Sequence, residues 1–328
     1  MATADQLKAL IRCHAEGDEE RFYAVALQVA AQEARSGHTR FAQELRDLVD
    51  RARERQQVTP IGQRTKPVPV AQPRGELVGL LTVSYPKTQL GDMALDDSVR
   101  LRIERVLVEQ RERERIQQHG FHPIRKLLLV GAPGTGKTMT AAALAGELAL
   151  PLFVIQLDGL ITKFLGETAA KLRLIFDAVQ QTRAVYLFDE FDALGGERTS
   201  KNEVGEIRRV LNSFLQFLEH DESDSLVVAA TNHPKLLDRA LFRRFDDVIE
   251  YVLPGREIGE QVLRSRLALL DTAAIDWTQV RAAMDDLSHA DLTRACEHAA
   301  KKTILAHRTN VETRDLVEAL EARRASHR

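Results

Sequence analysis

The stretch "KLLLVGAPGTGKTMTAAALAGEL", residues 126–148, carries the strongest fold signal in the 328-residue sequence. A nearly continuous apolar run precedes Gly131–Thr138, which match the pattern G-x-x-x-x-G-K-[ST], and an alanine-rich run of helical period follows. In a strand–loop–helix unit, glycines allow successive backbone N–H groups to turn towards phosphate oxygens, and the helix N-terminus adds the positive end of its dipole. The stretch therefore predicts a phosphate-binding loop.

The chemistry of this loop predicts which residues contact a nucleotide. Lys137 is expected to reach the β- and γ-phosphates, and Thr138 is expected to supply a ligand to magnesium. The bound groups that we expect are accordingly ATP and Mg2+. The predicted nucleotide contacts in this stretch are Gly131, Ala132, Pro133, Gly134, Thr135, Gly136, Lys137, Thr138 and Met139.

Short apolar runs around the loop outline a sheet. They lie at 126–131, 152–158, 184–190, 225–232 and 247–254, and helical segments separate them. Continuous rather than alternating apolar strands indicate a parallel sheet covered on both faces. The pattern predicts a doubly wound α/β domain with a five-stranded parallel sheet over 86–255. Four helical stretches follow, which predicts an all-helical lid domain over 256–328.

Polar side chains end two of these apolar runs. Asp189 and Glu190 end "AVYLFDE", and Asn232 ends "SLVVAATN", so all three are expected at the carboxyl edge of the sheet, where ligands bind. Asp189 would join Thr138 in the magnesium shell, and Glu190 would orient and deprotonate the attacking water. Asn232 can donate to a γ-phosphate and accept from that water. The structural alternatives are two acids that cap a strand and an asparagine that forms a turn.

A pair of arginines follows in "ALFRRFDD", residues 240–247, where Phe242 and Phe245 flank Arg243 and Arg244. A guanidinium is permanently charged and grips planar anions in a fork. The residues therefore raise the question of which anion they bind and on which molecule.

Together these motifs resemble those of the AAA ATPases over residues 86–328. "GAPGTGKT" resembles the Walker A motif, "VYLFDE" the Walker B motif and Asn232 sensor 1, while "LDRALFRRFD" resembles the second region of homology with adjacent arginine fingers. The resemblance implies a hexameric ring in which Arg243 and Arg244 reach the γ-phosphate on the neighbouring subunit. An arginine finger is worth on the order of 10³–10⁵ in rate, so a lone protomer is expected to be nearly inactive.

Further segments carry the resemblance beyond the phosphate site. "TKFLGET" (162–168) resembles the first pore loop, in which Phe164 and Leu165 would contact an extended polypeptide and Gly166 would permit a tight turn; the alternative is that Phe164 belongs to the core. "LSHADL" (287–292) resembles the lid signature Ser-Gly-Ala-Asp, with Ala290 as a nucleotide contact and His289 in place of glycine. This departure leaves open how closely the turn approaches the adenine, and His289 can either pack over the base or lie in a surface turn. "LGDMAL" (90–95) occupies the place where the family contacts adenine.

The first 85 residues form two further regions. Residues 1–57 show three apolar helical stripes, which predict a small helical module that either docks a partner or packs on the main domain. Residues 58–85 form a proline-rich linker in which "LVGLLTV" (77–83) can make a short strand or dock elsewhere. The stretch 19–49 resembles the N-terminal region of bacterial stand-alone AAA ATPases encoded beside a subtilisin-like serine protease, which implies a separate protease as a possible partner.

Composition excludes several other classes. The net charge of -2 argues against a dedicated nucleic-acid binder, and the two cysteines have no C-x-x-C spacing. No apolar run reaches the length of a membrane span, and no secretory signal is evident, so we expect a soluble cytoplasmic protein without a membrane partner.

Three functions remain open on the sequence. The first is a ring-forming ATPase that remodels, unfolds or disassembles protein substrates, which the Phe164–Leu165 pair and the near-neutral charge favour. The second is a nucleic-acid-dependent ATPase of the loader or helicase type, which would need a basic channel. The third is a nucleotide-gated scaffold with little turnover, which the presence of Glu190 disfavours.

Overall fold

A computed structural model of the chain describes residues 75–326, except 161–164, 195–200 and 238. These residues belong to one compact unit. The predicted helical module (1–57), most of the predicted linker and Phe164 lie outside the described residues. None of the described helices has the length and apolar character that crossing a bilayer requires.

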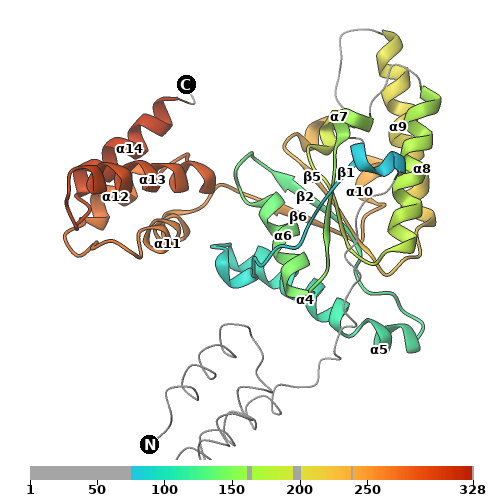
Figure 1. Cartoon of the computed structure of the whole chain (residues 1–328), viewed down its shortest axis with the longest axis horizontal. Helices are drawn as coiled ribbons and strands as arrows, with labels where there is room; N and C mark the ends of the chain where they lie inside the picture. The colour runs from blue at the N-terminus through green and yellow to red at the C-terminus, as the bar shows by residue number, and fades with distance from the viewer. Residues whose placement is uncertain (1–74, 161–164, 195–200, 238, 327–328) are drawn as a thin grey trace, which may run out of the picture. The chain divides into compact units, whose positions relative to one another are not determined.

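A six-stranded sheet in the order β1-β3-β4-β5-β2-β6 forms the centre of the α/β part (Figure 1). Every neighbouring pair is parallel except β1 and β3, which are antiparallel with Leu81 opposite Ile155. The doubly wound α/β fold is thus confirmed, and β1 adds one antiparallel edge strand to the predicted five. The strands are β1 (Leu81–Ser84), β2 (Lys126–Gly131), β3 (Leu152–Ile155), β4 (Val185–Phe188), β5 (Leu226–Thr231) and β6 (Asp247–Tyr251).

Strand β1 lies inside the stretch that the proline and glycine content assigns to a linker. Its short apolar run finds hydrogen-bonding partners on β3, and Leu80 and Leu81 join the core. The local composition predicts the turns around this run. It does not predict the pairing with β3, because that strand lies some seventy residues further along the chain.

Helices cover the two faces of the sheet. Between the strands lie α4 (Asp97–Arg111), α5 (Arg113–Gln118), α6 (Lys137–Glu147), α7 (Leu157–Leu160), α8 (Leu165–Gln181), α9 (Lys201–His220) and α10 (Arg239–Phe242). Single 3-10 turns occur at η1 (Gly75–Gly79), η2 (Leu90–Asp92), η3 (Phe191–Leu194) and η4 (Pro234–Leu236). Helices α8 and α9 lie on one side of the strands, and α4 and α6 lie on the other (Figure 1).

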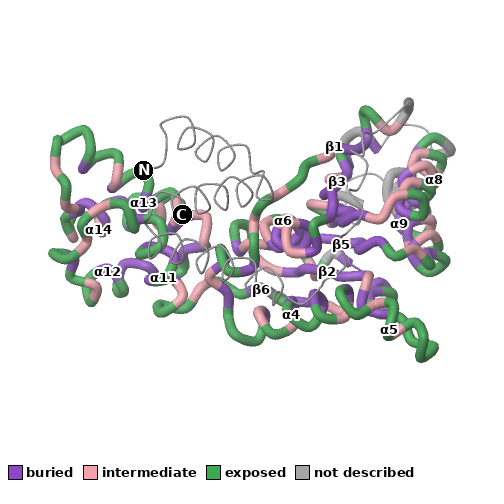
Figure 2. The backbone as a smooth tube through the Cα atoms, turned by 60° about the horizontal axis from the view of Figure 1, so that its bottom comes forward, coloured by how far each residue is buried: buried purple, intermediate pink, exposed green. Residues whose placement is uncertain are grey.

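Alternate residues of each central strand enter two separate cores. On β2, Leu128 packs in a cluster that includes Phe214 of α9, whereas Leu127 packs in a cluster that includes Leu144 of α6. The strand residues are buried on both faces, as the purple trace of β2 and β5 shows in Figure 2. This double coverage is the reason that the strands read as continuous apolar runs in the sequence.

The C-terminal helices form a third core of their own. They are α11 (Arg256–Arg266), α12 (Trp277–Ala283), α13 (His289–Leu305) and α14 (Thr313–Ala325). Leu263, Leu292 and Leu320 are fully buried in this cluster. Glu260 on α11 accepts hydrogen bonds from Arg281 and Arg264, and these contacts hold the pKa of its carboxyl below its usual range.

Candidate active site

The loop Gly131–Thr138 joins the end of β2 to the start of α6. Gly134 and Gly136 have φ angles of +75° and +107°, a backbone region that side chains other than glycine rarely adopt. Helix α6 begins at Lys137 with Gly136 as its N-cap, and no side chain caps its first N–H groups. Those N–H donors and the helix dipole are therefore arranged for an anion, as the sequence pattern predicts.

Lys137 is held at this loop by the backbone. Its Nζ donates to the carbonyl oxygens of Gly131 and Ala132, each at 2.8 Å, and the residue is 6% exposed. Burial lowers the pKa of the ammonium, while the nearby carboxylates of Asp189 and Asp192 act in the opposite direction. The site thus has one buried cation beside two acids, at the mouth of a helix N-terminus.

The two predicted magnesium ligands are in direct contact. Thr138 Oγ1, at the start of α6, donates to Asp189 Oδ2 at the end of β4 across 2.7 Å. Two neighbouring oxygens of an octahedral Mg2+ shell lie about 2.9 Å apart, given metal–oxygen distances near 2.1 Å. This oxygen pair therefore fits two positions in the shell of one magnesium ion.

Glu190 follows Asp189 with a strained backbone. Its φ angle is +50°, which is uncommon for a residue other than glycine and clusters at functional positions. Its N–H donates to Asp189 Oδ1 at 3.0 Å, so the Asp189 carboxylate is anchored to the backbone of Glu190. The sequence locates this pair at a strand end and carries no sign of the strain.

Asn232 lies at the end of the adjacent strand β5. Asp192 binds this strand end: its Oδ1 accepts from Thr231 Oγ1 at 2.8 Å and from the N–H of Asn232 at 3.2 Å. The carboxylate thereby ties the end of β5 to η3, the turn that follows Asp189 and Glu190. Sequence reasoning missed Asp192, although its position three residues after Asp189 in "FDEFD" is the signal that was available.

Arg243 and Arg244 lie at the opposite end of the sheet. They precede β6, whose first residue Asp247 pairs with Leu127 at the start of β2, whereas Gly131 at the loop pairs with Tyr251. Four residues of strand separate the two ends by about 13 Å. The structure therefore does not bring the arginines to the phosphate loop of their own chain.

The surroundings of the two arginines differ. Arg244 forms an ion pair with Glu219 of α9, whereas Arg243 is exposed and has no ion-pair partner among the residues that the structure describes. Together with Lys126 and Glu219, they line an open cavity of about 450 Å3. A guanidinium that meets no carboxylate and faces open space can accept an external anion.

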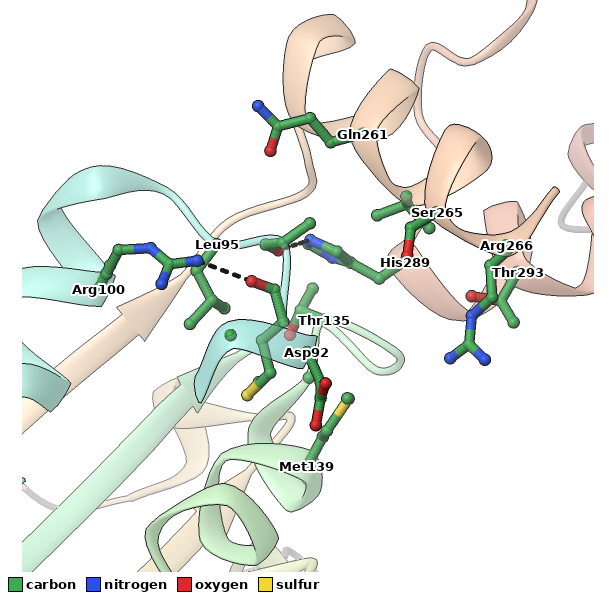
Figure 3. A pocket seen from close by; sticks show the side chains of 15 residues that line it. Asp92, Leu95, Arg100, Thr135, Met139, Gln261, Ser265, Arg266, His289 and Thr293 are labelled. Atoms are coloured by element: carbon green, nitrogen blue, oxygen red, sulfur yellow. Dashed lines mark hydrogen bonds between the residues drawn. The ribbon is translucent and has the colours of Figure 1, made fainter. Parts of the chain in front are cut away.

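A second cavity, of about 250 Å3, opens beside the phosphate loop. Figure 3 shows that the segment after η2, the loop and the lid helices α11 and α13 all contribute to it. Met139, one of the predicted nucleotide contacts, lines this cavity. Its lining residues come from both the α/β part and the lid, which places a ligand here in contact with both.

The lid signature lies against the phosphate loop. The N–H of Ala290 donates to Gly134 O at 3.1 Å, and a Cβ atom added to Gly134 would lie 2.6 Å from Ser288 Oγ. Ser288 caps α13 in a reciprocal capping box with Asp291. His289, in place of glycine, reaches in a different direction and bonds Ala94 O at 3.0 Å.

The segment predicted as a pore loop is described only in part. Phe164 lies outside the described residues, and Leu165 and Gly166 form the first turn of α8. The tight turn expected at Gly166 is thus the start of a helix, in which i→i+4 hydrogen bonds take the place of a loop conformation.

Comparison with known proteins identifies the family. Residues 127–253 match the family model for the ATPase family associated with various cellular activities (AAA). The chain is 34% identical over 327 residues to the uncharacterised AAA family ATPase y4kL of Sinorhizobium fredii, covering 99% of this chain and 97% of that protein.

Relatives with further activities match over part of their length. ATP-dependent zinc metalloprotease FtsH 3 of Sphaerobacter thermophilus is 31% identical, covering 76% of this chain and 52% of that protein. Proteasome-activating nucleotidase 1 of Halobacterium salinarum is 32% identical, covering 69% of this chain and 58% of that protein. The crystal structure of the FIGL-1 AAA domain superimposes with a TM-score of 0.60 at 25% identity, covering 74% of this chain and 85% of that one. With a phosphate loop, a Thr–Asp oxygen pair and a near full-length relative of the same kind, this chain belongs to the AAA family of ATPases.

Proposed function

We propose that this ATPase works as a magnesium-dependent ring, a hexamer as in the family resemblance, and couples ATP hydrolysis to the remodelling of protein substrates. The observation that carries the proposal is the separation of the phosphate loop from Arg243 and Arg244 at opposite ends of β2 and β6. One chain supplies the cradle and the acids, and a second copy must supply the guanidinium.

Within one chain, each polar residue has a distinct task. Lys137 neutralises the β- and γ-phosphates, and Thr138 and Asp189 are the residues that would hold Mg2+, which would offset charge on the phosphate oxygens. Glu190 accepts a proton from the water that attacks the γ-phosphorus, and the bond to the β,γ-bridging oxygen breaks to give ADP and phosphate. Asn232 orients that water through its side-chain amide.

Mixing of two inactive variants tests the shared site. Arg243→Ala lacks the guanidinium, and Glu190→Gln lacks the base, so each variant alone is expected to lose ATPase activity by roughly 10³-fold or more. In a mixed ring, an intact Glu190 faces an intact Arg243 at some interfaces, and activity returns. The control replaces the first partner by the double variant Arg243→Ala/Glu190→Gln, which can form no intact interface. Mixed rings that co-purify and stay inactive would refute action between subunits.

Protein rather than nucleic acid is the proposed substrate. Two relatives are named an ATP-dependent zinc metalloprotease and a proteasome-activating nucleotidase, and both names refer to protein degradation. The net charge of this chain, -2, lacks the basic excess that is typical of a nucleic-acid binder. We expect an unfolded protein such as denatured casein to stimulate hydrolysis, and single-stranded DNA to leave it unchanged. The opposite pattern would favour the nucleic-acid-dependent alternative. Phe164 and Leu165 are the residues proposed to contact the polypeptide, and Phe164→Ala should abolish the stimulation while it spares basal turnover.

A separate serine protease is the proposed partner for degradation. The sequence contains no H-E-x-x-H zinc site, so this chain does not share the metalloprotease motif of zinc-dependent peptidases. The helical module predicted over 1–57 is proposed to dock that protease. The full chain should co-purify with the protease and a 58–328 fragment should not; equal recovery of both would remove the docking role.

A further inference from the structure

His289 crosses the cavity beside the phosphate loop. It is the first residue of α13 in the lid, and its Nε2 bonds Ala94 O at 3.0 Å, on the segment that follows η2. Figure 3 shows the imidazole reaching from the lid side of the cavity to this segment, with Arg100 reaching the same segment from the opposite side. The hydrogen bond joins two parts of the chain that are 195 residues apart.

Two successive peptide groups of that segment are fixed by these side chains. Arg100 donates to Met93 O at 2.8 Å, and His289 Nε2 contacts Ala94 O. The carbonyl of Met93 and the N–H of Ala94 share one planar trans peptide, so they point in opposite directions. Arg100 therefore sets the direction of the Ala94 N–H, which points away from Arg100.

The N–H of Ala94 has no acceptor among the residues that the structure describes. Ala94 is half-buried and lines the cavity together with Gly91, Met93 and His289. A backbone donor that is fixed in direction, without a protein partner and at the wall of a cavity suits a ligand that brings an acceptor. The phosphate loop borders the same cavity through Thr135 and Gly136, so the adjoining part of a nucleotide is its nucleoside.

We propose that His289 is a positioning residue for the purine base of ATP. It holds the Ala94–Leu95 peptide while Arg100 holds the Met93–Ala94 peptide, so that the Ala94 N–H between the two contacts is fixed as a donor to a ring nitrogen of the base, and the same bond joins the lid to this segment. The inference rests on the proposed ATPase site and adds a base-recognition device to it. Arg100 is the second anchor of the same peptide segment.

The arrangement of the imidazole carries a cost that a packing role alone does not explain. His289 Nδ1 is buried and has no hydrogen-bond partner among the described residues. An unsatisfied buried polar atom costs roughly 1–3 kcal/mol, so glycine, or an apolar residue, would be less costly if the position only filled space. The hydrogen bond from Nε2 to Ala94 O offsets this cost, and only a side chain with a polar atom at that position can form it.

The test separates base recognition from phosphate binding. We would measure kcat and KM for ATP, together with the inhibition constant of inorganic tripolyphosphate, which has phosphates and no base. His289→Ala should raise the KM for ATP about tenfold, because the variant loses the hydrogen bond that joins the lid to Ala94. The kcat at saturation and the inhibition by tripolyphosphate should remain at wild-type values.

Three variants control the interpretation. His289→Gln restores a side-chain N–H donor and should recover most of the affinity for ATP. His298→Ala removes an exposed histidine from the same helix and should change nothing. Arg100→Ala should raise the KM in the same direction, and the double variant His289→Ala/Arg100→Ala should cost less than the product of the single effects, because both anchor one peptide segment.

Two results would overturn the inference while the proposed ATPase function stands. One is a His289→Ala enzyme whose KM for ATP is unchanged. The other is an equal loss of affinity for ATP and tripolyphosphate, which would mean general damage to the loop. Absence of ATP hydrolysis by the wild-type ring, by contrast, would remove the proposed function itself, and binding of a fluorescent ATP analogue would still test the His289 contact.

Discussion

Substitution of Gly134 by alanine tests whether the lid must lie against the phosphate loop. The φ angle of Gly134 is +75°, and a Cβ atom there would come within 2.6 Å of Ser288 Oγ and 2.9 Å of Ala290 Cβ. Real Cβ atoms do not approach that closely, so the lid turn must move away. The movement also breaks the hydrogen bond from the Ala290 N–H to Gly134 O.

The magnitude follows from two contributions that act on different equilibria. A left-handed conformation at alanine costs roughly 1–2 kcal/mol, and this strain lowers the free energy of unfolding with or without nucleotide. Loss of the Ala290 hydrogen bond costs about 1 kcal/mol, and this cost falls on the closed arrangement of lid and loop. Where nucleotide binding needs that arrangement, the dissociation constant for ATP should rise at least about fivefold.

The chain offers a matched control for the backbone contribution. Gly120 has a φ angle of +79°, and a Cβ atom added there meets nothing within 4 Å. Gly120→Ala should lower the free energy of unfolding by a similar strain and leave ATP affinity untouched. The assay is titration with a fluorescent ATP analogue, with thermal unfolding of both variants alongside. If Gly134→Ala binds ATP as tightly as Gly120→Ala does, the lid contact has no part in nucleotide binding.

Three further predictions follow from individual contacts. Thr138→Val removes one oxygen of the pair with Asp189, so the magnesium concentration needed for half-maximal hydrolysis should rise at least tenfold, and a magnesium titration checks it. Arg281 and Arg264 lower the pKa of Glu260, so their stabilisation of the lid is present above the ordinary value of 4.5 and is lost as pH falls through the lowered pKa; thermal unfolding of wild type should decline below pH 4.5 more steeply than that of Glu260→Gln. Burial raises the pKa of the Cys296 thiol to about 12, so peptide-resolved alkylation at pH 8 should leave this thiol unmodified until the protein unfolds.

The sequence was sufficient for the elements whose chemistry is local. The phosphate loop, the strand that ends in Asp189 and the strand that ends in Asn232 each carry their signal within about eight residues, and continuous apolar runs indicate parallel strands. The contact between Thr138 and Asp189 follows from those elements, because parallel strands bring their carboxyl ends to one edge.

Other features depend on partners that the local sequence does not contain. Strand β1 acquires its structure from pairing with β3, and the proline-rich composition around it predicts a linker. The role of Asp192 emerges only when η3 and the end of β5 are adjacent. His289 is readable as a departure from a family pattern, but its bond to Ala94 needs the lid and the α/β part in contact.

Strand β1 also determines how the sheet would respond to mechanical load. Tension applied at Gly75, the first described residue, reaches the sheet at β1, whose four residues pair antiparallel with β3. Pulling along the strand loads all of those hydrogen bonds in shear at once, whereas pulling across it would open them one after another. Strand β3 pairs directly with β4, and Asp189 and Glu190 follow the end of β4. A force applied at β1 is therefore transmitted two strands across the sheet, to the position of Asp189 and Glu190, the carboxylates proposed to serve ATP hydrolysis.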